Sequence, residues 1–337
     1  MKLNPIFSSH MVFAQGHPIR IYGEGCGRAN IFFAGQNRKV VSDGEEWFVE
    51  FESMEYGGPY ELKVDFCDRS IVLDDIFIGE VFLFAGQSNM QFKLGESLTP
   101  KALYETNDRL RMFFTDRIEK TDMFTAADGW VKSNKDTVEH WSAIAYLAAN
   151  RLSKTHGVAV GVITCYQGAS TIESWVPKGA FSEIGIKIDN KYKFQDHTIE
   201  EYSAWNGEGV LYSFALSQVT PFSLSAVVWY QGESDTSIHE GEVYADELGR
   251  LINIWRSDFK NDKLPFVIIQ IADYIERDDE GWKLVQAAQE KIQFMIPGVK
   301  TVVSADVCEN YEVHPQTKAG IAERVADTLQ EMLNISI

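Results

Sequence analysis

The sequence predicts an α/β protein in which a doubly wound parallel sheet follows a small N-terminal β-sandwich domain. Short strand-like pieces separated by turns fill the first 75 residues, and apolar runs alternate with amphipathic helical stretches after that point. Strand–helix alternation of this length is typical of a parallel sheet with helices on both faces. We therefore expect two domains, residues 1–75 and residues 76–337.

The N-terminal part contains short, apolar-rich pieces with the sequences "IRIYG", "NIFFAG", "EWFVEF" and "YELKVDF". The last two alternate apolar and polar residues, and "SDGEE" and "YGGP" have the composition of turns. Such a pattern indicates a small sandwich of antiparallel strands, of jelly-roll or immunoglobulin-like type. Its role stays open between binding a ligand and covering the neighbouring domain.

The second part contains near-continuous apolar runs, which suit parallel strands buried on both faces. These runs are residues 80–86, 158–164, 225–231, 265–273 and 299–306. Helical spacing of apolar residues, with a closing glycine in the first case, predicts helices between and after them. The expected helices are residues 140–157, 244–259, 281–295 and 317–333.

Composition narrows the possible partners. The 31 basic and 49 acidic residues give a net charge of −18, which disfavours binding to nucleic acid. No apolar run reaches the roughly 20 residues that span a membrane, and the N-terminus lacks the features of a signal peptide. We therefore expect a cytoplasmic protein with no nucleic-acid or membrane partner. The sequence does not determine the oligomeric state, and a homo-oligomer is one possibility.

Polar, glycine-rich segments follow the predicted strands. Ser88 lies in "GQSN" after the first, Gly168 follows the second, Gln231 ends the third, and His314 comes after the last. In a doubly wound sheet the carboxyl ends of the strands form the ligand-binding edge. A serine, a histidine and amide donors at one edge are the groups that acyl transfer requires.

Four of these blocks, "GQSNM", "YQGAS", "WYQGESD" and "HP", resemble those of SGNH hydrolases, and more narrowly of sialate O-acetylesterase-like carbohydrate esterases. The N-terminal "FSSHMVFAQGHPIRIYGEG" is similar to the β-domain that precedes the hydrolase part in bacterial members. The resemblance spans nearly the whole chain and implies a flavodoxin-like SGNH fold. A GxSxG motif would favour an α/β-hydrolase instead, and the chain has no such motif.

The resemblance implies that Ser88 is the nucleophile and His314 the general base. A serine hydroxyl is protonated at neutral pH and needs a base beside it. His314 would take that proton during attack and return it to the leaving sugar hydroxyl. The alternatives are a turn serine and a surface histidine.

In the resembling proteins an aspartate two or three residues before the histidine completes a catalytic triad with the serine and the histidine. This chain departs from that pattern, because it has no aspartate at those positions. Glu312 occupies this region, and a surface glutamate is its alternative reading. Glu233 is a competing group to orient the ring, and Asp306 is a third. A Ser–His pair without a carboxylate also remains possible.

The oxyanion hole is expected from the backbone N–H groups of Ser88 and Gly168 and the side-chain amide of Gln231. Gly168 offers close approach because it has no Cβ, although turn glycines are common. Asn89 is assigned to support of the loop and is a secondary candidate for substrate binding. Trp175 is a candidate for stacking on a sugar, with a place in the core as the alternative.

The leading hypothesis is removal of O-acetyl groups from a mono- or oligosaccharide through an acetyl-enzyme. Acetylated sialic acid and acetylated xylan or mannan fragments are both candidate substrates. A non-catalytic carbohydrate-binding protein on a decayed hydrolase scaffold is the alternative of another class, and a lipase or thioesterase is a third. No metal-binding spacing and no phosphate-binding glycine loop occurs, so the mechanism is expected to need no cofactor.

Overall fold

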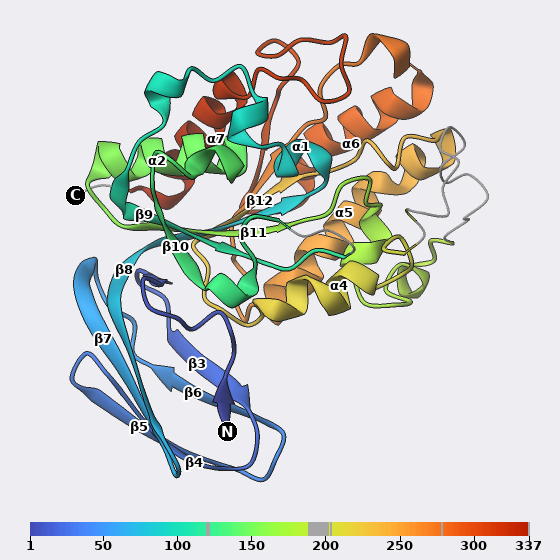
Figure 1. The fold of residues 1–337 in the computed structure, drawn as a ribbon. Helices are drawn as coiled ribbons and strands as arrows, with labels where there is room; N and C mark the ends of the chain where they lie inside the picture. Colours follow the sequence, from blue (N-terminus) through green and yellow to red (C-terminus); the bar gives the residue numbers. More distant parts are fainter. Residues whose placement is uncertain (119–121, 188–201, 203, 278, 336–337) are drawn as a thin grey trace.

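The structure, a computed structural model, describes residues 1–118, 122–187, 202, 204–277 and 279–335. Its central element is the long strand β8 (Ser70–Gly86). The first part of β8 pairs with N-terminal strands, and its second part lies in the middle of the main sheet (Figure 1). The strand crosses the expected domain boundary at residue 75 without a break.

The strands before β8 form two groups. One is an antiparallel sheet in the order β1-β3-β6, and the other pairs β4 with β5 and β7, and β7 with β8. Their bounds are β1 Lys2–Leu3, β2 Val12–Ala14, β3 Ile19–Glu24, β4 Gly27–Phe33, β5 Gln36–Ser42, β6 Glu46–Phe51 and β7 Gly57–Phe66. The rings of Phe33 and Phe51 are 6.3 Å apart between centroids, and those of Trp47 and Phe66 are 6.2 Å apart, so side chains of the two groups contact each other.

The main sheet has the strand order β10-β9-β11-β8-β12-β13-β14. The added strands are β9 Asn107–Phe114, β10 Trp130–Ser133, β11 Val160–Tyr166, β12 Ala226–Tyr230, β13 Phe266–Ile269 and β14 Val299–Val302. All pairs in this path are parallel except β10 with β9, which is antiparallel. The expectation of a wholly parallel sheet is therefore corrected to a mixed one.

Helices lie on both sides of this sheet, with α2 and α7 on one side and α4 and α5 on the other (Figure 1). The helices are α1 Ser88–Gln91, α2 Ala143–His156, α4 Val210–Phe214, α5 Ile238–Asp258, α6 Glu280–Met295 and α7 Ala319–Leu333. Side-chain caps start α2, α5 and α6 at Ser142, Ser237 and Asp279, because a side-chain oxygen accepts one of the N–H groups that lack an intrahelical partner. The Ser237 cap places the start of α5 six residues before the expected position.

The N-terminal strands are tied to the main sheet by buried polar contacts. The Tyr22 hydroxyl donates to the Val219 carbonyl at 3.0 Å, and the Arg20 guanidinium donates to the Phe259 carbonyl at 2.8 Å. The Trp130 indole N–H donates to the Ile6 carbonyl at 2.8 Å. Since buried donors without partners are costly, these bonds favour one fixed placement of the two parts.

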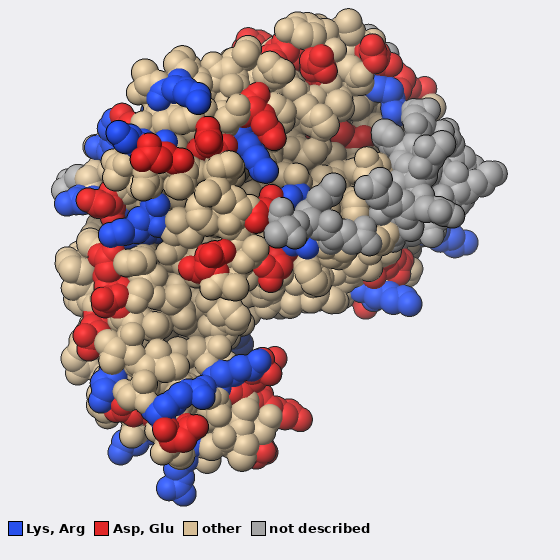
Figure 2. All heavy atoms as spheres, viewed as in Figure 1, with Lys and Arg blue, Asp and Glu red and all other residues tan. Residues whose placement is uncertain are grey.

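Charged side chains of both signs are interspersed over the described atoms on the face in Figure 2, which is hollowed where the N-terminal strands meet the larger part. Among the described residues, no helix combines the length and apolar character needed to cross a membrane.

Gly86 ends β8 in a conformation that excludes other residues. Its φ is 138°, and a Cβ there would overlap the backbone carbonyl oxygen of Tyr230. We predict that Gly86→Ala lowers the free energy of unfolding by more than about 3 kcal/mol, since it adds a clash with backbone to an unfavourable φ. Urea unfolding followed by circular dichroism measures this change.

Gly16→Ala is the matched control, because Gly16 has a φ of 70° but no atom within 4 Å of the added Cβ. It should cost about 1 kcal/mol, from backbone conformation alone. Equal losses from the two variants would show that the close approach at Gly86 does not matter.

Candidate active site

The register of the sheet places the loops after β8, β11 and β12 side by side at one edge. Tyr166 of β11 and Tyr230 of β12 both pair with Gly86 of β8, on its two sides. The segments that follow these residues therefore leave the sheet at the same edge and next to one another. These segments carry Ser88, Gly168 and Glu233.

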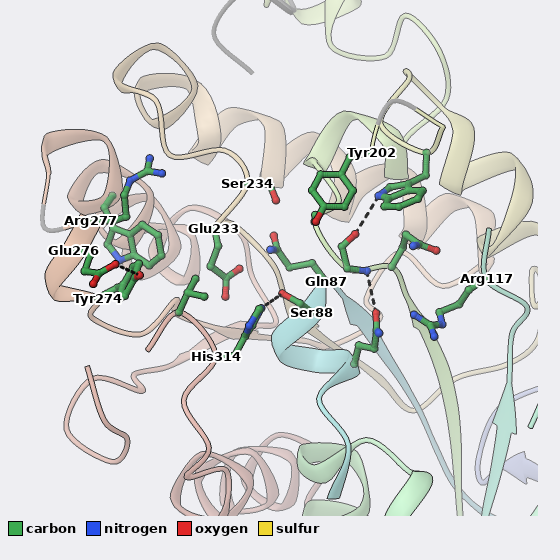
Figure 3. A pocket seen from close by; sticks show the side chains of 17 residues that line it. Gln87, Ser88, Arg117, Tyr202, Glu233, Ser234, Tyr274, Glu276, Arg277 and His314 are labelled. Atoms are coloured by element: carbon green, nitrogen blue, oxygen red, sulfur yellow. Dashed lines mark hydrogen bonds between the residues drawn. The ribbon is translucent and has the colours of Figure 1, made fainter. Parts of the chain in front are cut away.

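Ser88 and His314 meet at this edge. Ser88 begins α1 directly after β8, and His314 lies in the segment between β14 and α7. The distance between Ser88 Oγ and His314 Nε2 is 2.7 Å, and the two side chains point toward one another (Figure 3). This is within the range for direct proton transfer from a nucleophile to its base.

The surroundings of His314 favour its neutral form. Burial lowers the pKa of the imidazole below its ordinary 6.5, and the positive charge of Lys318 lowers it further. The carboxylate of Glu96 acts in the opposite direction but is the smallest of the three effects. A neutral imidazole can accept a proton, so these effects keep His314 in the form that a general base needs.

Glu312 is not brought to the ring, which corrects the first choice for the triad acid. Its side chain is exposed, and it makes no hydrogen bond with any described residue. Asp306 is also elsewhere, paired through both carboxylate oxygens with Arg324 at 2.6 and 2.7 Å. The extra methylene of Glu312 does not compensate for a backbone that directs the side chain into solvent.

Glu233 is the carboxyl group that does lie at the site, where it faces the Ser88–His314 pair (Figure 3). Its Oε1 accepts a hydrogen bond from Asn89 Nδ2 at 2.5 Å, and its Oε2 is buried without a partner among the described residues. Burial raises the pKa of this carboxyl group. No hydrogen bond joins the second ring nitrogen of His314 to any residue in the described part of the chain.

Two of the three expected oxyanion donors are at the site. The N–H of Ser88, at the start of α1, has no intrahelical acceptor. Gly168 lies beside it, since a Cβ on Gly168 would be 3.8 Å from that of Ser88. The Gly168 N–H donates to Gln91 Oε1 at 3.0 Å, so the Gln91 side chain has to turn away before this N–H can bind an oxyanion.

The third expected donor, Gln231, is committed elsewhere. It is fully buried, and its amide N–H groups donate to the Ser170 carbonyl at 2.9 Å and to the Asp235 carboxylate. Its Oε1 accepts from the Tyr244 hydroxyl at 2.8 Å. This amide holds neighbouring loops together and has no donor left for an oxyanion.

A cavity of about 480 Å³ opens over the Ser88–His314 pair. Its wall is largely polar and aromatic, and it consists of Gln87, Ser88, Gln91, Arg117, Gln167, Gly168, Ala169, Tyr202, Trp205, Glu233, Ser234, Tyr274, Glu276, Arg277, Trp282, Val313 and His314. Arg117 is held by both oxygens of Asp122, at 2.5 and 2.7 Å. The cavity has room for a sugar-sized ligand.

The prediction that Trp175 and Asn89 bind the substrate is wrong, because other residues form the wall of the cavity. Trp175 is fully buried beside Trp229 and Trp255, with ring centroids 5.8 and 6.4 Å away, and Asn89 is 1% exposed. Neither lines the cavity. Trp175 therefore lies in the core and supports from there the loop that carries Gly168. This agrees with the alternative interpretation of Trp175 as a core residue.

Tyr202, Trp205, Tyr274 and Trp282 line the cavity but were not singled out from the sequence. Tyr274 could have been predicted from the sequence, because it directly follows the predicted strand at residues 265–273 and therefore lies at the ligand-binding edge of the sheet. The others lie in segments whose place in the fold is set by tertiary packing.

Comparisons with known proteins agree on one family. A family model described as carbohydrate esterase, sialic acid-specific acetylesterase, matches residues 78–331. Human sialate O-acetylesterase is 24% identical over 323 residues, which cover 85% of this chain and 60% of that protein. A probable carbohydrate esterase of Arabidopsis thaliana is 26% identical over 231 residues, covering 64% of this chain and 78% of the other.

Among solved structures, a carbohydrate acetylesterase from Xanthomonas citri superposes with a TM-score of 0.84 at 23% identity. The match covers 99% of this chain and 75% of that one, so the two share a fold. The chain spans about 60% of the length of the human relative that it matches.

The state of His314 leads to a prediction about the reactivity of Ser88. A fluorophosphonate probe modifies a serine that a neutral base activates, so its rate should rise with pH through the lowered pKa of His314. We predict a midpoint below pH 6.5, with reactivity present above it and lost as the pH falls. Intact-mass measurement of the labelled protein at different pH values gives the rates, and a midpoint above 6.5 would contradict the neutral-base interpretation.

Proposed function

Because the chain belongs to this sialic acid-specific acetylesterase family of carbohydrate esterases, we propose that it hydrolyses O-acetyl esters of carbohydrates. The observation that carries the proposal is the 2.7 Å contact between Ser88 Oγ and His314 Nε2 at the floor of the cavity. The contact supplies a nucleophile and a base together, as acyl transfer to a serine requires.

In the proposed mechanism, His314 Nε2 accepts the Ser88 proton as Oγ forms a bond with the acetyl carbonyl carbon. The tetrahedral intermediate collapses when the bond from this carbon to the sugar oxygen breaks, and the imidazolium gives its proton to that oxygen. The sugar leaves and Ser88 carries the acetyl group. His314 then takes a proton from water, which attacks the carbonyl, and the proton returns to Ser88 as acetate leaves.

We propose that the developing negative charge is bound by the N–H groups of Ser88 and Gly168. A substrate carbonyl oxygen would displace Gln91 Oε1 from the Gly168 N–H, which exchanges one hydrogen bond for another. Each such donor contributes about 3 kcal/mol to transition-state stabilisation. Glu233, rather than Glu312, is proposed as the carboxyl group that borders the cavity beside this pair, and its buried Oε2 has no partner among the described residues.

The sugar is proposed to bind against the aromatic and polar wall of the cavity. Sialate esters are the first candidates, because the family description and the human relative are named for them. Acetylated xylan or mannan oligosaccharides remain the alternative within the same chemistry. We also propose that residues 1–75 form an accessory β-sandwich domain and that residues 76–337 form an SGNH-type esterase domain.

A substitution series tests the assignment of the catalytic groups. Ser88→Ala and His314→Ala should each lower kcat for 4-nitrophenyl acetate by at least about 1,000-fold, because each removes half of the nucleophile–base pair. Glu312→Gln should leave kcat within about threefold of wild type, since this exposed side chain makes no contact with the ring. Circular dichroism and thermal unfolding report whether each variant is folded.

A loss from Glu312→Gln as severe as that from His314→Ala would restore Glu312 as the triad acid. Turnover that survives in Ser88→Ala would remove the serine mechanism.

The substrate is tested by acetate release from a panel of O-acetylated sialic acids and acetylated xylo- and manno-oligosaccharides. The proposal expects turnover of at least one of these sugars that depends on Ser88. Binding of sugars without any acetate release would favour the non-catalytic alternative, and rates that rise with acyl chain length would favour a lipase or thioesterase.

A further inference from the structure

A buried lysine lies behind the Ser88–His314 pair and is not used in the mechanism above. Lys318 precedes α7 and is 1% exposed, and it does not line the cavity. Its Nζ donates to Asn89 Oδ1 at 2.6 Å and lies 4.7 Å from the centroid of the Phe92 ring. An ammonium group is costly to bury unless it is partnered, so its position calls for an explanation.

Asn89 connects this lysine to both sides of the site. Its Nδ2 donates to the Val313 carbonyl at 2.9 Å and to Glu233 Oε1 at 2.5 Å. With Oδ1 bound to Lys318, the carbonyl and both N–H groups of the amide are used. A turned amide would face the ammonium group with its own N–H groups, so Lys318 fixes which way Asn89 points.

The arrangement joins the residue after Ser88 to the residue before His314. Asn89 follows the serine in the chain, and the carbonyl that it binds belongs to Val313. The described residues supply no hydrogen bond to the second nitrogen of His314, so no hydrogen-bonding side chain orients the imidazole from that side. The Phe92 ring lies 6.5 Å away between centroids, and the backbone just before His314 is held by the Asn89 amide.

We propose that Lys318, acting through Asn89, positions His314 against Ser88 in place of the carboxylate that holds the histidine of a triad. This role rests on the proposed esterase function. Lys318 and Asn89 are positioning residues, because neither contacts the cavity in which the substrate would bind.

The charge of Lys318 has a second effect on the same pair. Burial lowers the pKa of Lys318 to about 8, so the ammonium form predominates at neutral pH, and its charge lowers the pKa of His314. The other charged or titratable groups that face these two residues are Glu96 near His314, and Glu233, Cys308 and Glu309 near Lys318. Removing the lysine charge should therefore raise the pKa of His314.

Lys318→Met tests the proposal, because methionine fills the buried space without the charge or the donor. We expect kcat for 4-nitrophenyl acetate to fall about 10- to 100-fold with KM unchanged, as for a misplaced catalytic group. NMR titration of the His314 imidazole should show its pKa raised, because the positive charge beside it is gone. The raised pKa reports the loss of the lysine charge, and the fall in kcat without a change in KM reports the loss of positioning.

Lys300→Met is the matched control. Lys300 lies on β14, and its Nζ is 3.9 Å from Glu331 at the exposed surface. The same change of charge there should alter neither kcat nor the pKa of His314. Wild-type kcat and an unchanged His314 pKa in Lys318→Met would overturn the proposal.

Asn89→Ala provides a second test that leaves the lysine charge in place. It should lower kcat to a similar extent but shift the pKa of His314 less than Lys318→Met does. At a pH where His314 is neutral in every variant, the loss in the double variant should be no larger than in Asn89→Ala alone, because the lysine positions the histidine through the amide. The proposal would be contradicted if the double variant lost as much kcat as the product of the two single losses. Wild-type kcat in Asn89→Ala would also contradict it, and this result can be obtained even if Lys318→Met does not fold.

The His314 titration needs no substrate, so it separates this inference from the proposed function. Wild-type protein that hydrolyses no acetyl ester, yet shows the shift of His314 in Lys318→Met, would overturn the esterase proposal and still support the influence of Lys318 on the histidine.

Discussion

The parallel pairing of β8 with β11 and β12 is the constraint on which the site depends. Gly86 faces Tyr166 on one side and Tyr230 on the other, so the chain leaves all three strands at the same level. The close approach at Gly86 fixes this level, because only a residue without a Cβ fits against the Tyr230 carbonyl. A change of register in any of the three strands would separate Ser88, Gly168 and Glu233.

The chemistry of the site follows from how charge is buried around it. His314 is kept neutral by burial and by a nearby ammonium group, whereas the carboxyl group of Glu233 is held by an amide. Burial strengthens these interactions because the effective dielectric constant is low. A base of lowered pKa is available at neutral pH, and in the proposed mechanism it accepts a proton first from Ser88 and then from water.

The sequence could predict what depends on order along the chain. Buried parallel strands are continuous apolar runs, and the polar segments that follow them contain Ser88 and His314, to which the family resemblance gave roles. Strand β9, which lies between β10 and β11, was not predicted because it begins with the charged sequence "NDR". The choices of Gln231 and Trp175 failed for another reason, since the direction of each side chain depends on tertiary partners, Tyr244 for Gln231 and Trp255 for Trp175. Glu312 failed because its backbone directs the side chain into solvent. The partnership of Lys318 with Asn89 spans 229 positions and leaves no local pattern.

The most direct test of the account is to identify the residue that carries the acetyl group during turnover. The protein is mixed with 4-nitrophenyl acetate, quenched in acid within the first turnovers, digested and analysed by mass spectrometry. The account predicts a single acetyl group on Ser88, absent from the Ser88→Ala variant. Continued release of acetate with no acetyl group on Ser88, or with the group on another residue, would contradict it.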